Sequence, residues 1–294
     1  MNQKTKSKLC IIASMAIFGT LAPFVRNISV SSGELALYRA VMASIMIGGY
    51  LLLKRQKLNI SRMGRDLPIL FLSGAAMGIN WILLFEAYKY TTVSVATLSY
   101  YFAPVIVTIV CPILFKEKMT KKQILCFVMS TAGLALVVGI SNLGGGSSDT
   151  LGVLFGLGAA CFYATVVILN KYIKNVSGIH RTLLQFLAAI IVLVPYIAMT
   201  SGVNLNSMNS TGWICLLIVG LVHTGICYCL YFSSLKDLTG QQAAILSYID
   251  PLVAVVISVA VLGEAITLSQ LIGGVLILGF TLWNEVGSSK EEKI

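Results

Sequence analysis

Long apolar segments recur along the whole chain, and they constrain its fold more than any other feature. A helix needs about 20 mostly apolar residues to cross the hydrocarbon core of a bilayer. Ten segments meet this requirement: 9–27, 33–53, 67–88, 92–115, 121–140, 151–171, 178–200, 211–234, 239–262 and 266–285. The breaks between them are too short for a soluble domain. We therefore predict an all-α integral membrane protein with ten transmembrane helices.

The scarcity of charge supports this prediction. Only 11% of the 294 residues are charged and 57% are hydrophobic, whereas a soluble domain carries about 25% charged residues. A net charge of +10 would suggest nucleic acid in a soluble protein. Here the basic residues lie in short segments between apolar runs, so we expect no nucleic-acid partner. The expected partners are the lipid bilayer and a small-molecule solute.

The basic residues also predict an orientation, because cytoplasmic loops are enriched in Lys and Arg. With a cytoplasmic N-terminus and alternating spans, 18 of the 21 basic residues reach the cytoplasmic side. They are Lys4, Lys6, Lys8, Lys54, Arg55, Lys57, Arg62, Arg65, Lys116, Lys118, Lys121, Lys122, Lys171, Lys174, Arg181, Lys236, Lys290 and Lys293. We expect a multi-pass protein of the cell (inner or plasma) membrane with both termini in the cytoplasm.

The second half of the chain repeats the first at an offset of 147 residues. From Gly78 to Val128, 13 of 51 positions are identical to their partners. The shared residues include Tyr101 with Tyr248, Pro104 with Pro251, and Glu117 with Glu264.

A five-span repeat has an odd number of spans, so the second copy must enter the membrane upside down. Inverted repeats place a binding site near the midplane and allow alternating access. We predict a first five-helix repeat at 1–143, a linker at 144–150, a second, inverted repeat at 151–286, and a cytoplasmic tail at 287–294.

Short motifs give the chain a family resemblance. They are Ala16-Ile17-Phe18-Gly19, Tyr38-Arg39, Pro104 followed by Lys116-Glu117-Lys118, and Pro251 followed by Gly263-Glu264. The chain resembles the EamA-type members of the drug/metabolite transporter superfamily over essentially its whole length. The resemblance implies ten helices in two inverted repeats and export of amino acids, related metabolites or drugs. The related small multidrug exporters carry a carboxylate in their first helix, and the first span here has none.

Asp250 is the clearest candidate for a functional charge inside the membrane, where charges are costly and usually functional. It lies near the middle of the segment 239–262, and Pro251 follows it. The proline cannot donate to the carbonyl of Ser247, so we predict a kink there, and a matching one at Pro104. Asp250 either binds a cationic group or a proton, or is a protonated residue bonded to a neighbouring helix.

Arg39 and His223 are the other intramembrane candidates. We favour an Arg39 paired with Glu34 or Glu86, although its planar fork would also suit a substrate carboxylate. Tyr38 precedes it in the same motif. His223 lies within the segment 211–234 and is interpreted first as a packing residue, with a proton or substrate contact as the alternative.

Aromatic and amide side chains gather on the same spans. Candidates for the lining of a wet cavity are Asn80, Trp81, Tyr101, Tyr228 and Tyr248, because buried tyrosine hydroxyls need hydrogen-bond partners. Helix packing is the alternative. No spacing of Cys and His suits a metal, so we expect neither a metal nor a cofactor.

These features favour a secondary transporter of small polar metabolites, most simply an exporter of amino acids or related compounds. A multidrug or organic-cation exporter and a lipid-carrier flippase are alternatives on the same scaffold. An integral membrane enzyme is disfavoured, since no HExxH, GxSxG or close pair of intramembrane carboxylates is present. The residues do not specify the solute, the coupling ion, the direction or the oligomeric state, and a monomer is compatible with them.

Overall fold

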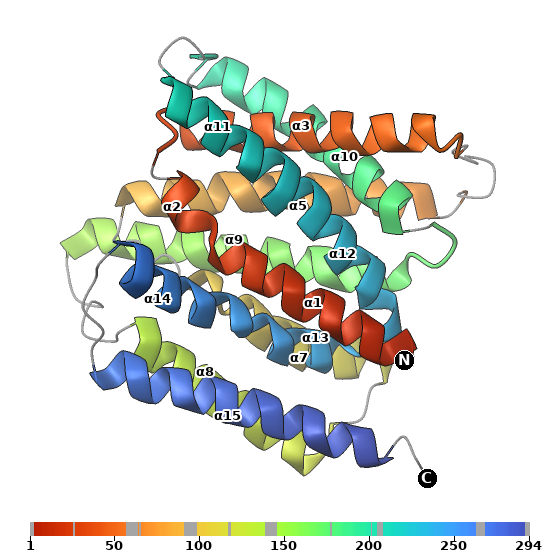
Figure 1. Cartoon of the computed structure of the whole chain (residues 1–294), viewed down its shortest axis with the longest axis vertical. Helices are drawn as coiled ribbons and strands as arrows, with labels where there is room; N and C mark the ends of the chain where they lie inside the picture. Colours follow the sequence, from red (N-terminus) through yellow and green to blue (C-terminus); the bar gives the residue numbers. More distant parts are fainter. Residues whose placement is uncertain are drawn as a thin grey trace.

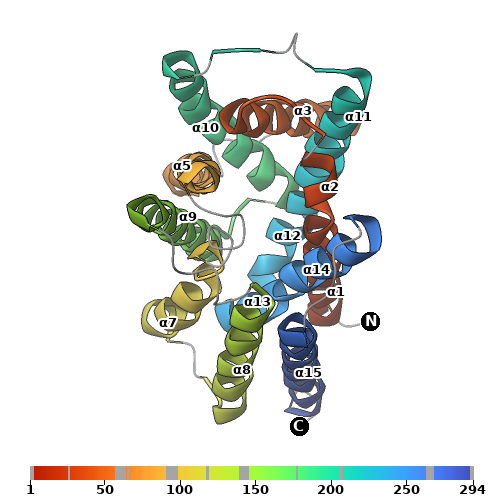
Figure 2. The ribbon, with the colours of Figure 1, turned by 90° about the vertical axis from the view of Figure 1, so that its left-hand side faces the viewer.

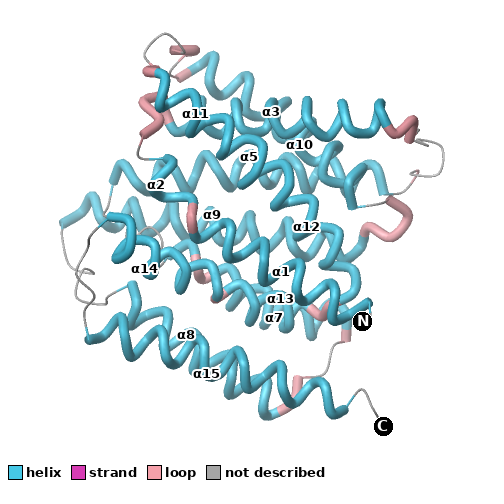
Figure 3. The backbone as a smooth tube through the Cα atoms, in the orientation of Figure 1, coloured by secondary structure: helices cyan, strands magenta, loops and turns pink. Residues whose placement is uncertain are grey.

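The computed structural model describes residues 3–25, 27–56, 64, 66–90, 99–116, 119–138, 146–176, 178–200, 202–204, 208–262 and 268–291. All regular secondary structure in these ranges is helical, as Figure 3 shows. The class of fold predicted from the sequence is therefore confirmed for the described residues.

The helices follow one another with short connections. In the first half they are α1 (Gln3–Gly19), α2 (Leu21–Val25), α3 (Ser32–Leu53), α5 (Asp66–Tyr90), α7 (Ala103–Phe115) and α8 (Lys121–Val138). In the second half they are α9 (Gly146–Tyr172), α10 (Gly178–Met199), α11 (Ser210–Ile218), the π-helix η3 (Val219–Ile226), α12 (Cys227–Ser234), the 3-10 turn η4 (Leu235–Asp237), α13 (Gly240–Ser247), α14 (Ile249–Leu262) and α15 (Leu268–Glu291). Figure 1 shows their arrangement.

Six helical segments in the described residues are long and apolar enough to cross a membrane. They are Gln3–Val25, Ser32–Leu53, Asp66–Ala87, Thr150–Tyr172, Gly178–Met199 and Ser210–Asp237. The expected count of ten is therefore not reached by these criteria. The segments around 92–115 and 239–262 contribute shorter helices, because the chain turns at Tyr101 and Phe102 before α7 and at Tyr248 between α13 and α14.

Two helices extend into the segments predicted as the linker (144–150) and the tail (287–294). Helix α9 already begins at Gly146, and α15 continues to Glu291. Residues 144 and 145 and residues 292–294 lie outside the described part.

Local capping explains where two important helices begin. Ser31 and Glu34 form a capping box at the start of α3, and Thr239 and Gln242 form another at the start of α13. In each box the side chains satisfy backbone N–H groups that have no partner within the helix. Helix α3, which carries Arg39, is therefore fixed at its first turn.

Contacts between the two halves of the chain build the bundle. Helix α5 packs along α9 and α10, α3 packs along α10 and η3, and α1 packs against α12 and α14. Helices α8 and α15 pack on each other, and Figure 2 shows them side by side at one end of the elongated bundle. The main core cluster lies where α1, α3, α5, α10 and α12 meet.

The outward faces of the helices are apolar. Leu53 is 87% exposed and Ile113 is 74% exposed, which in a soluble protein would be unfavourable. On helices of membrane-spanning length, such side chains suit contact with lipid.

Arg181, one of the basic residues assigned to the cytoplasmic side, fastens several helices together. It lies within the first turn of α10 and is only 1% exposed. Its guanidinium donates to the carbonyls of Asn170, Ile173, Val176 and Phe232. A basic residue beside the carbonyl end of α9 also offsets the partial negative charge there.

Candidate functional site

Arg39 places a buried positive charge at the centre of the bundle. Its side chain extends from α3 and the residue is 4% exposed. Arg39 Nε donates a hydrogen bond of 2.9 Å to Thr224 Oγ1 on η3. The guanidinium carbon lies 4.9 Å from the centre of the Trp81 ring on α5, a geometry suited to a cation–π interaction.

The expected pairing of Arg39 with Glu34 or Glu86 is wrong. Glu34 instead caps α3 and accepts hydrogen bonds from Tyr38 Oη and from the backbone N–H of Asn204. Glu86 instead pairs with Lys89 and accepts a hydrogen bond from Tyr196 Oη. Both acids bind groups near the ends of their helices, and no described carboxylate forms an ion pair with Arg39.

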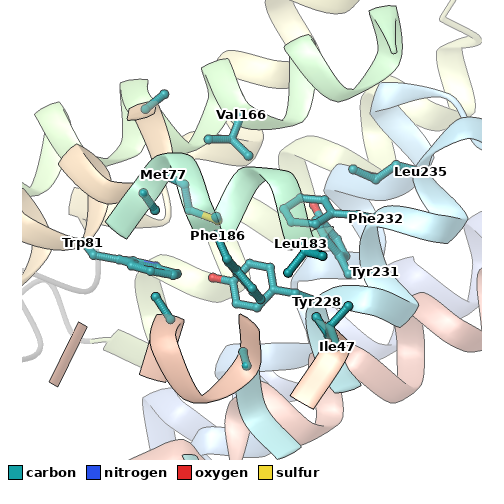
Figure 4. Close-up of a cluster of buried hydrophobic side chains, with 14 of the residues drawn as sticks. Ile47, Met77, Trp81, Val166, Leu183, Phe186, Tyr228, Tyr231, Phe232 and Leu235 are labelled. Carbon is teal, nitrogen blue, oxygen red and sulfur yellow. The ribbon is translucent and has the colours of Figure 1, made fainter. Parts of the chain in front are cut away.

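Aromatic rings gather around Tyr228, next to the Trp81 ring that the guanidinium faces. The Tyr228 ring on α12 lies 6.1 Å from Trp81, 5.6 Å from Phe186 and 5.0 Å from Phe18, measured between ring centroids. Figure 4 shows Trp81, Phe186 and Tyr228 gathered in the core. Trp81 and Tyr228 were candidates from the sequence, whereas Phe186 was missed because it lies outside the two aligned stretches, 78–128 and 225–275.

The π-helix η3 presents two polar side chains to this region. Thr224 Oγ1 accepts from Arg39 and donates to the carbonyl of Val219, five residues earlier. His223 Nε2 lies 3.0 Å from Thr20 Oγ1, and its ring lies 5.2 Å from that of Phe24. Short π-helical stretches occur frequently at functional sites. His223 is thus a buried residue with a hydroxyl partner beside the site, which agrees with the packing interpretation.

Asp250 is a second ionisable residue, on the helix α14 that packs against α1. It lies in the first turn of α14, immediately after the interruption at Tyr248, and it hydrogen-bonds with the side chain of Tyr101. Tyr101 itself lies in the turn before α7. The interaction therefore joins two chain turns at equivalent positions of the sequence repeat.

Tyr248 and the two prolines lie nearby but have other contacts. Tyr248 is fully buried, and its hydroxyl lies 2.6 Å from Thr131 Oγ1 on α8. Pro251 is buried in the first turn of α14. Pro104 instead lines a small cavity together with Val107, Tyr163, Val167, Tyr231, Ala243, Ala244 and Ser247, which has room for about one water molecule.

Two further sequence candidates lie away from Arg39. Tyr38 Oη donates to Glu34 Oε1 over 3.1 Å, toward the beginning of α3. Asn80 Nδ2 donates to the carbonyl of Ala159 over 2.6 Å and thereby ties α5 to α9. Both contacts fix helices, so neither residue is brought into the group around the guanidinium.

The side chains around Arg39 are of the kinds that bind a solute. An arginine, a histidine and two threonine hydroxyls lie beside aromatic rings, in a bundle whose longest helices match the thickness of a bilayer. Intramembrane charges mark solute or ion pathways in membrane proteins. The fold and the site together define a polytopic membrane protein of the transporter class.

The chain belongs to the EamA-like transporter family. The family model matches it twice, over residues 5–139 and 150–284.

Curated relatives are also transporters. The uncharacterized transporter YxxF of Bacillus subtilis is 31% identical over 94% of this chain and 88% of its own length. An uncharacterized transporter of Archaeoglobus fulgidus is 28% identical over 94% of this chain and 95% of its own length. A solved structure with a TM-score of 0.82 and 16% identity covers 94% of this chain and 96% of its own. That last similarity concerns the fold alone.

Proposed function

We propose that this protein is a secondary transporter that moves small polar metabolites across the cell membrane by alternating access, as an exporter of amino acids or related compounds. The observation that carries the proposal is the buried Arg39 guanidinium, which has no described carboxylate as a partner. Burial of an unpaired charge is strongly unfavourable. A solute with a carboxylate would supply the missing negative charge through the planar fork of the guanidinium.

The alternating-access mechanism rests on the inverted arrangement of two five-helix halves. At the offset of the repeat, α1 corresponds to α9, α3 to α10, α5 to the segment from α11 to α12, and α7 to α14. The contact of α1 with α14 then has its counterpart in the contact of α9 with α7, and the contact of α5 with α9 has its counterpart in that of α12 with α1. A two-fold relation of this kind supports ten crossings in total, with α7, α8, α13–α14 and α15 completing the count.

A contact at one end of the bundle supports the proposed topology. Asp66 Oδ2, at the start of α5, accepts hydrogen bonds from the backbone N–H groups of Lys174 and Asn175, which follow α9. These two connections therefore lie at the same end, as cytoplasmic termini and alternating spans require. Gln56→Cys and Lys174→Cys, each as a single cysteine, should react with a membrane-impermeant thiol reagent from the same side of the membrane. Reaction from opposite sides would contradict this topology.

Flux measurements test the transport function. Purified protein in proteoliposomes is expected to catalyse exchange of labelled amino acids across a broad panel, and Arg39→Ala and Asp250→Asn are expected to lower it. Glu264→Gln, at a position outside the described residues, should lower it less at matched amounts of protein. The absence of solute-dependent flux for the whole panel would overturn the proposal.

Asp250 favours one second candidate, an exporter of organic cations. A carboxylate beside aromatic rings can bind a hydrophobic cation as well as an ammonium group. Arg39 argues against this alternative, because a cationic solute would leave its charge unpaired. Loss of cation transport alone in Asp250→Asn, with neutral and zwitterionic solutes unaffected, would favour it.

A further inference from the structure

Four buried polar residues form a cluster at the end of the bundle that the proposed topology places on the cytoplasmic side. They are Ser73 on α5, Asn170 on α9, and Arg181 and Gln185 on α10, and each is at most 1% exposed. Helix α5 lies between the other two helices (Figure 2). Gln185 Nε2 and Asn170 Nδ2 both donate to Ser73 Oγ, over 2.6 Å and 3.3 Å. Arg181 Nη1 donates to the backbone carbonyl of Asn170 over 3.2 Å, so the cluster ties three helices together.

This polar cluster leaves three of its side-chain atoms without a hydrogen-bond partner among the described residues. They are Asn170 Oδ1, Gln185 Oε1 and Arg181 Nε. A buried amide oxygen or guanidinium N–H without a partner carries the full cost of its desolvation. Water satisfies donors and acceptors alike, so exposure of the cluster to water would remove this cost at all three atoms.

Close packing of α5 on α10 fixes the polar cluster while this end is closed. A Cβ added at Gly74, the neighbour of Ser73, would lie 2.3 Å from the carbonyl oxygen of Gln185 and 2.6 Å from Ala188 Cβ. The two helix backbones are therefore in direct contact beside the unpartnered atoms. Full hydration of the cluster requires α5 and α10 to separate at this end.

The equivalent place at the other end of the bundle has a satisfied network. At the offset of 147 residues, Glu34 and Tyr38 of α3 correspond to Arg181 and Gln185 of α10, and the bounds of the two helices agree with this offset to within one residue. Glu34 accepts hydrogen bonds from Tyr38 Oη and from the backbone N–H of Asn204. Neither Glu34 nor Tyr38 has a buried side-chain atom without a partner. The two ends of the repeated scaffold thus differ in what closure leaves unsatisfied.

We infer that the polar cluster biases the empty transporter toward opening on the cytoplasmic side, so that the carrier takes up its solute there. This inference rests on the proposed alternating access and adds a resting state to it. Opening at this end hydrates three unpartnered atoms, whereas opening at the outer end breaks hydrogen bonds that are already made. Asp66 and Glu34 each accept hydrogen bonds that close one end, so these two contacts oppose each other and the cluster decides the balance. Relief of even one unpartnered group shifts such an equilibrium by about fivefold or more.

The test measures access to the centre of the bundle in the absence of solute. Thr224→Cys, in a background without native cysteines, is the reporter, because this residue is fully buried beside Arg39. A membrane-impermeant thiol reagent is applied to right-side-out and to inside-out membrane vesicles. Labelling of the reporter protein is expected to be at least about fivefold faster from the cytoplasmic side. Faster labelling from the outside would overturn the inference.

Two variants of the cluster should act in opposite directions. Ser73→Ala alone takes the acceptor from Gln185 Nε2 and adds an unpartnered group, so cytoplasmic labelling should rise and the Tm in detergent should fall. Ser73→Ala combined with Gln185→Met removes both partners together with the unpartnered Oε1, and replacement of both partners by apolar groups is nearly neutral or stabilising. This double variant should keep or raise the Tm, and cytoplasmic labelling should be at least about fivefold slower than in the reporter protein. Asn170 Nδ2 retains its bond to the Val166 carbonyl in both variants.

A matched control and a second variant keep the test decisive. Thr165→Val is the control, because Thr165 Oγ1 donates to the carbonyl of Cys161 in its own helix, and it should change labelling from neither side. If the double variant does not fold, Asn170→Leu replaces it, since this substitution removes the unpartnered Oδ1. Unchanged or faster cytoplasmic labelling in Asn170→Leu would count against the inference. An equal rise from both sides in Ser73→Ala would show a general loosening and would also overturn it.

The outcomes distinguish this inference from the proposed function, because labelling of the empty protein needs no transported solute. The predicted labelling pattern in a protein without flux for the whole solute panel would overturn the proposed function and leave the bias in place. Intact flux with equal labelling of the reporter protein and the double variant would overturn the inference alone. It would show that a bound water satisfies the cluster in the closed state.

Discussion

Arg39 of α3 and Thr224 of η3 are joined by a hydrogen bond of 2.9 Å from Nε to Oγ1, across the two halves of the chain. Thr224 Oγ1 in turn donates to the carbonyl of Val219 over 2.8 Å, so the hydroxyl is oriented by the π-helix that carries it. The position of the guanidinium thus depends on the local winding of a helix in the other half. This links the geometry of the proposed solute site to the conformation of η3.

Thr224→Val should weaken solute binding while the protein stays folded. The substitution keeps the shape of the side chain and removes the acceptor of the Arg39 hydrogen bond, and a hydrogen bond to a charged group contributes about 1.5–3 kcal/mol. We expect at least about a tenfold rise in the concentration that gives half-maximal exchange. Thr165→Val is the control, because Thr165 Oγ1 donates to the carbonyl of Cys161 in its own helix. Equal effects of the two variants would contradict a positioning role for Thr224.

Gly19→Ala should destabilise the contact between α1 and α14. An added Cβ would lie 2.6 Å from both the Asp250 carbonyl oxygen and Val253 Cβ, and overpacking of this kind costs about 1–3 kcal/mol. Thermal unfolding in detergent should show a lower Tm. Gly48→Ala is the matched control, since no atom lies within 4 Å of its added Cβ. A Tm of Gly19→Ala at or above that of Gly48→Ala would show that the helices can separate without cost.

Arg181→Met should lower stability more than it changes solute selectivity. The guanidinium donates to the carbonyls of Ile173 over 2.8 Å, Asn170 over 3.2 Å and Val176 over 3.3 Å. Each buried carbonyl left without a donor costs about 1–3 kcal/mol. The Tm in detergent is the measurement, and Lys174→Met, with an exposed side chain, is the control. A changed preference among solutes with an unchanged Tm would assign Arg181 to the solute path instead.

Hydropathy predicted the helical class correctly, because apolar length is a property of the sequence itself. Hydropathy did not predict which groups the buried charged side chains contact. Arg39 was expected to contact an acid near its own height in the membrane, but capping of α3 occupies Glu34, and Tyr196 and Lys89 occupy Glu86. Acids near helix ends have competing backbone and side-chain donors that spacing does not reveal.

The winding of individual helices was also beyond prediction. The π-helix η3 that orients Thr224 has no signature in the residues Val219–Ile226, because the apolar pattern of a π-helix differs little from that of an α-helix over so short a length. The proline positions indicated disturbed helices at Pro104 and Pro251, yet the turns fall two to three residues earlier, at Tyr101, Phe102 and Tyr248. Sequence spacing locates such turns only approximately, since helix packing decides where the chain leaves the helical path.

Two carboxylates hold opposite ends of α10 to the first half of the chain. Glu34 of α3 accepts from the backbone N–H of Asn204, which follows α10, and Asp66 of α5 accepts from those of Lys174 and Asn175, which precede it. Both contacts are present together in this structure. Alternating access requires that the two ends open in turn, so removal of one contact should shift the population toward opening at that end.

Glu34→Ala and Asp66→Ala should therefore have opposite effects on access to the centre of the bundle. Thr224→Cys in a background without native cysteines provides the reporter, because the residue is fully buried beside Arg39. A membrane-impermeant thiol reagent should label it faster from the outside in Glu34→Ala and faster from the cytoplasmic side in Asp66→Ala. A rise in labelling from the same side in both variants would mean that the contacts stabilise the fold without controlling access, because a general loosening has no preferred direction.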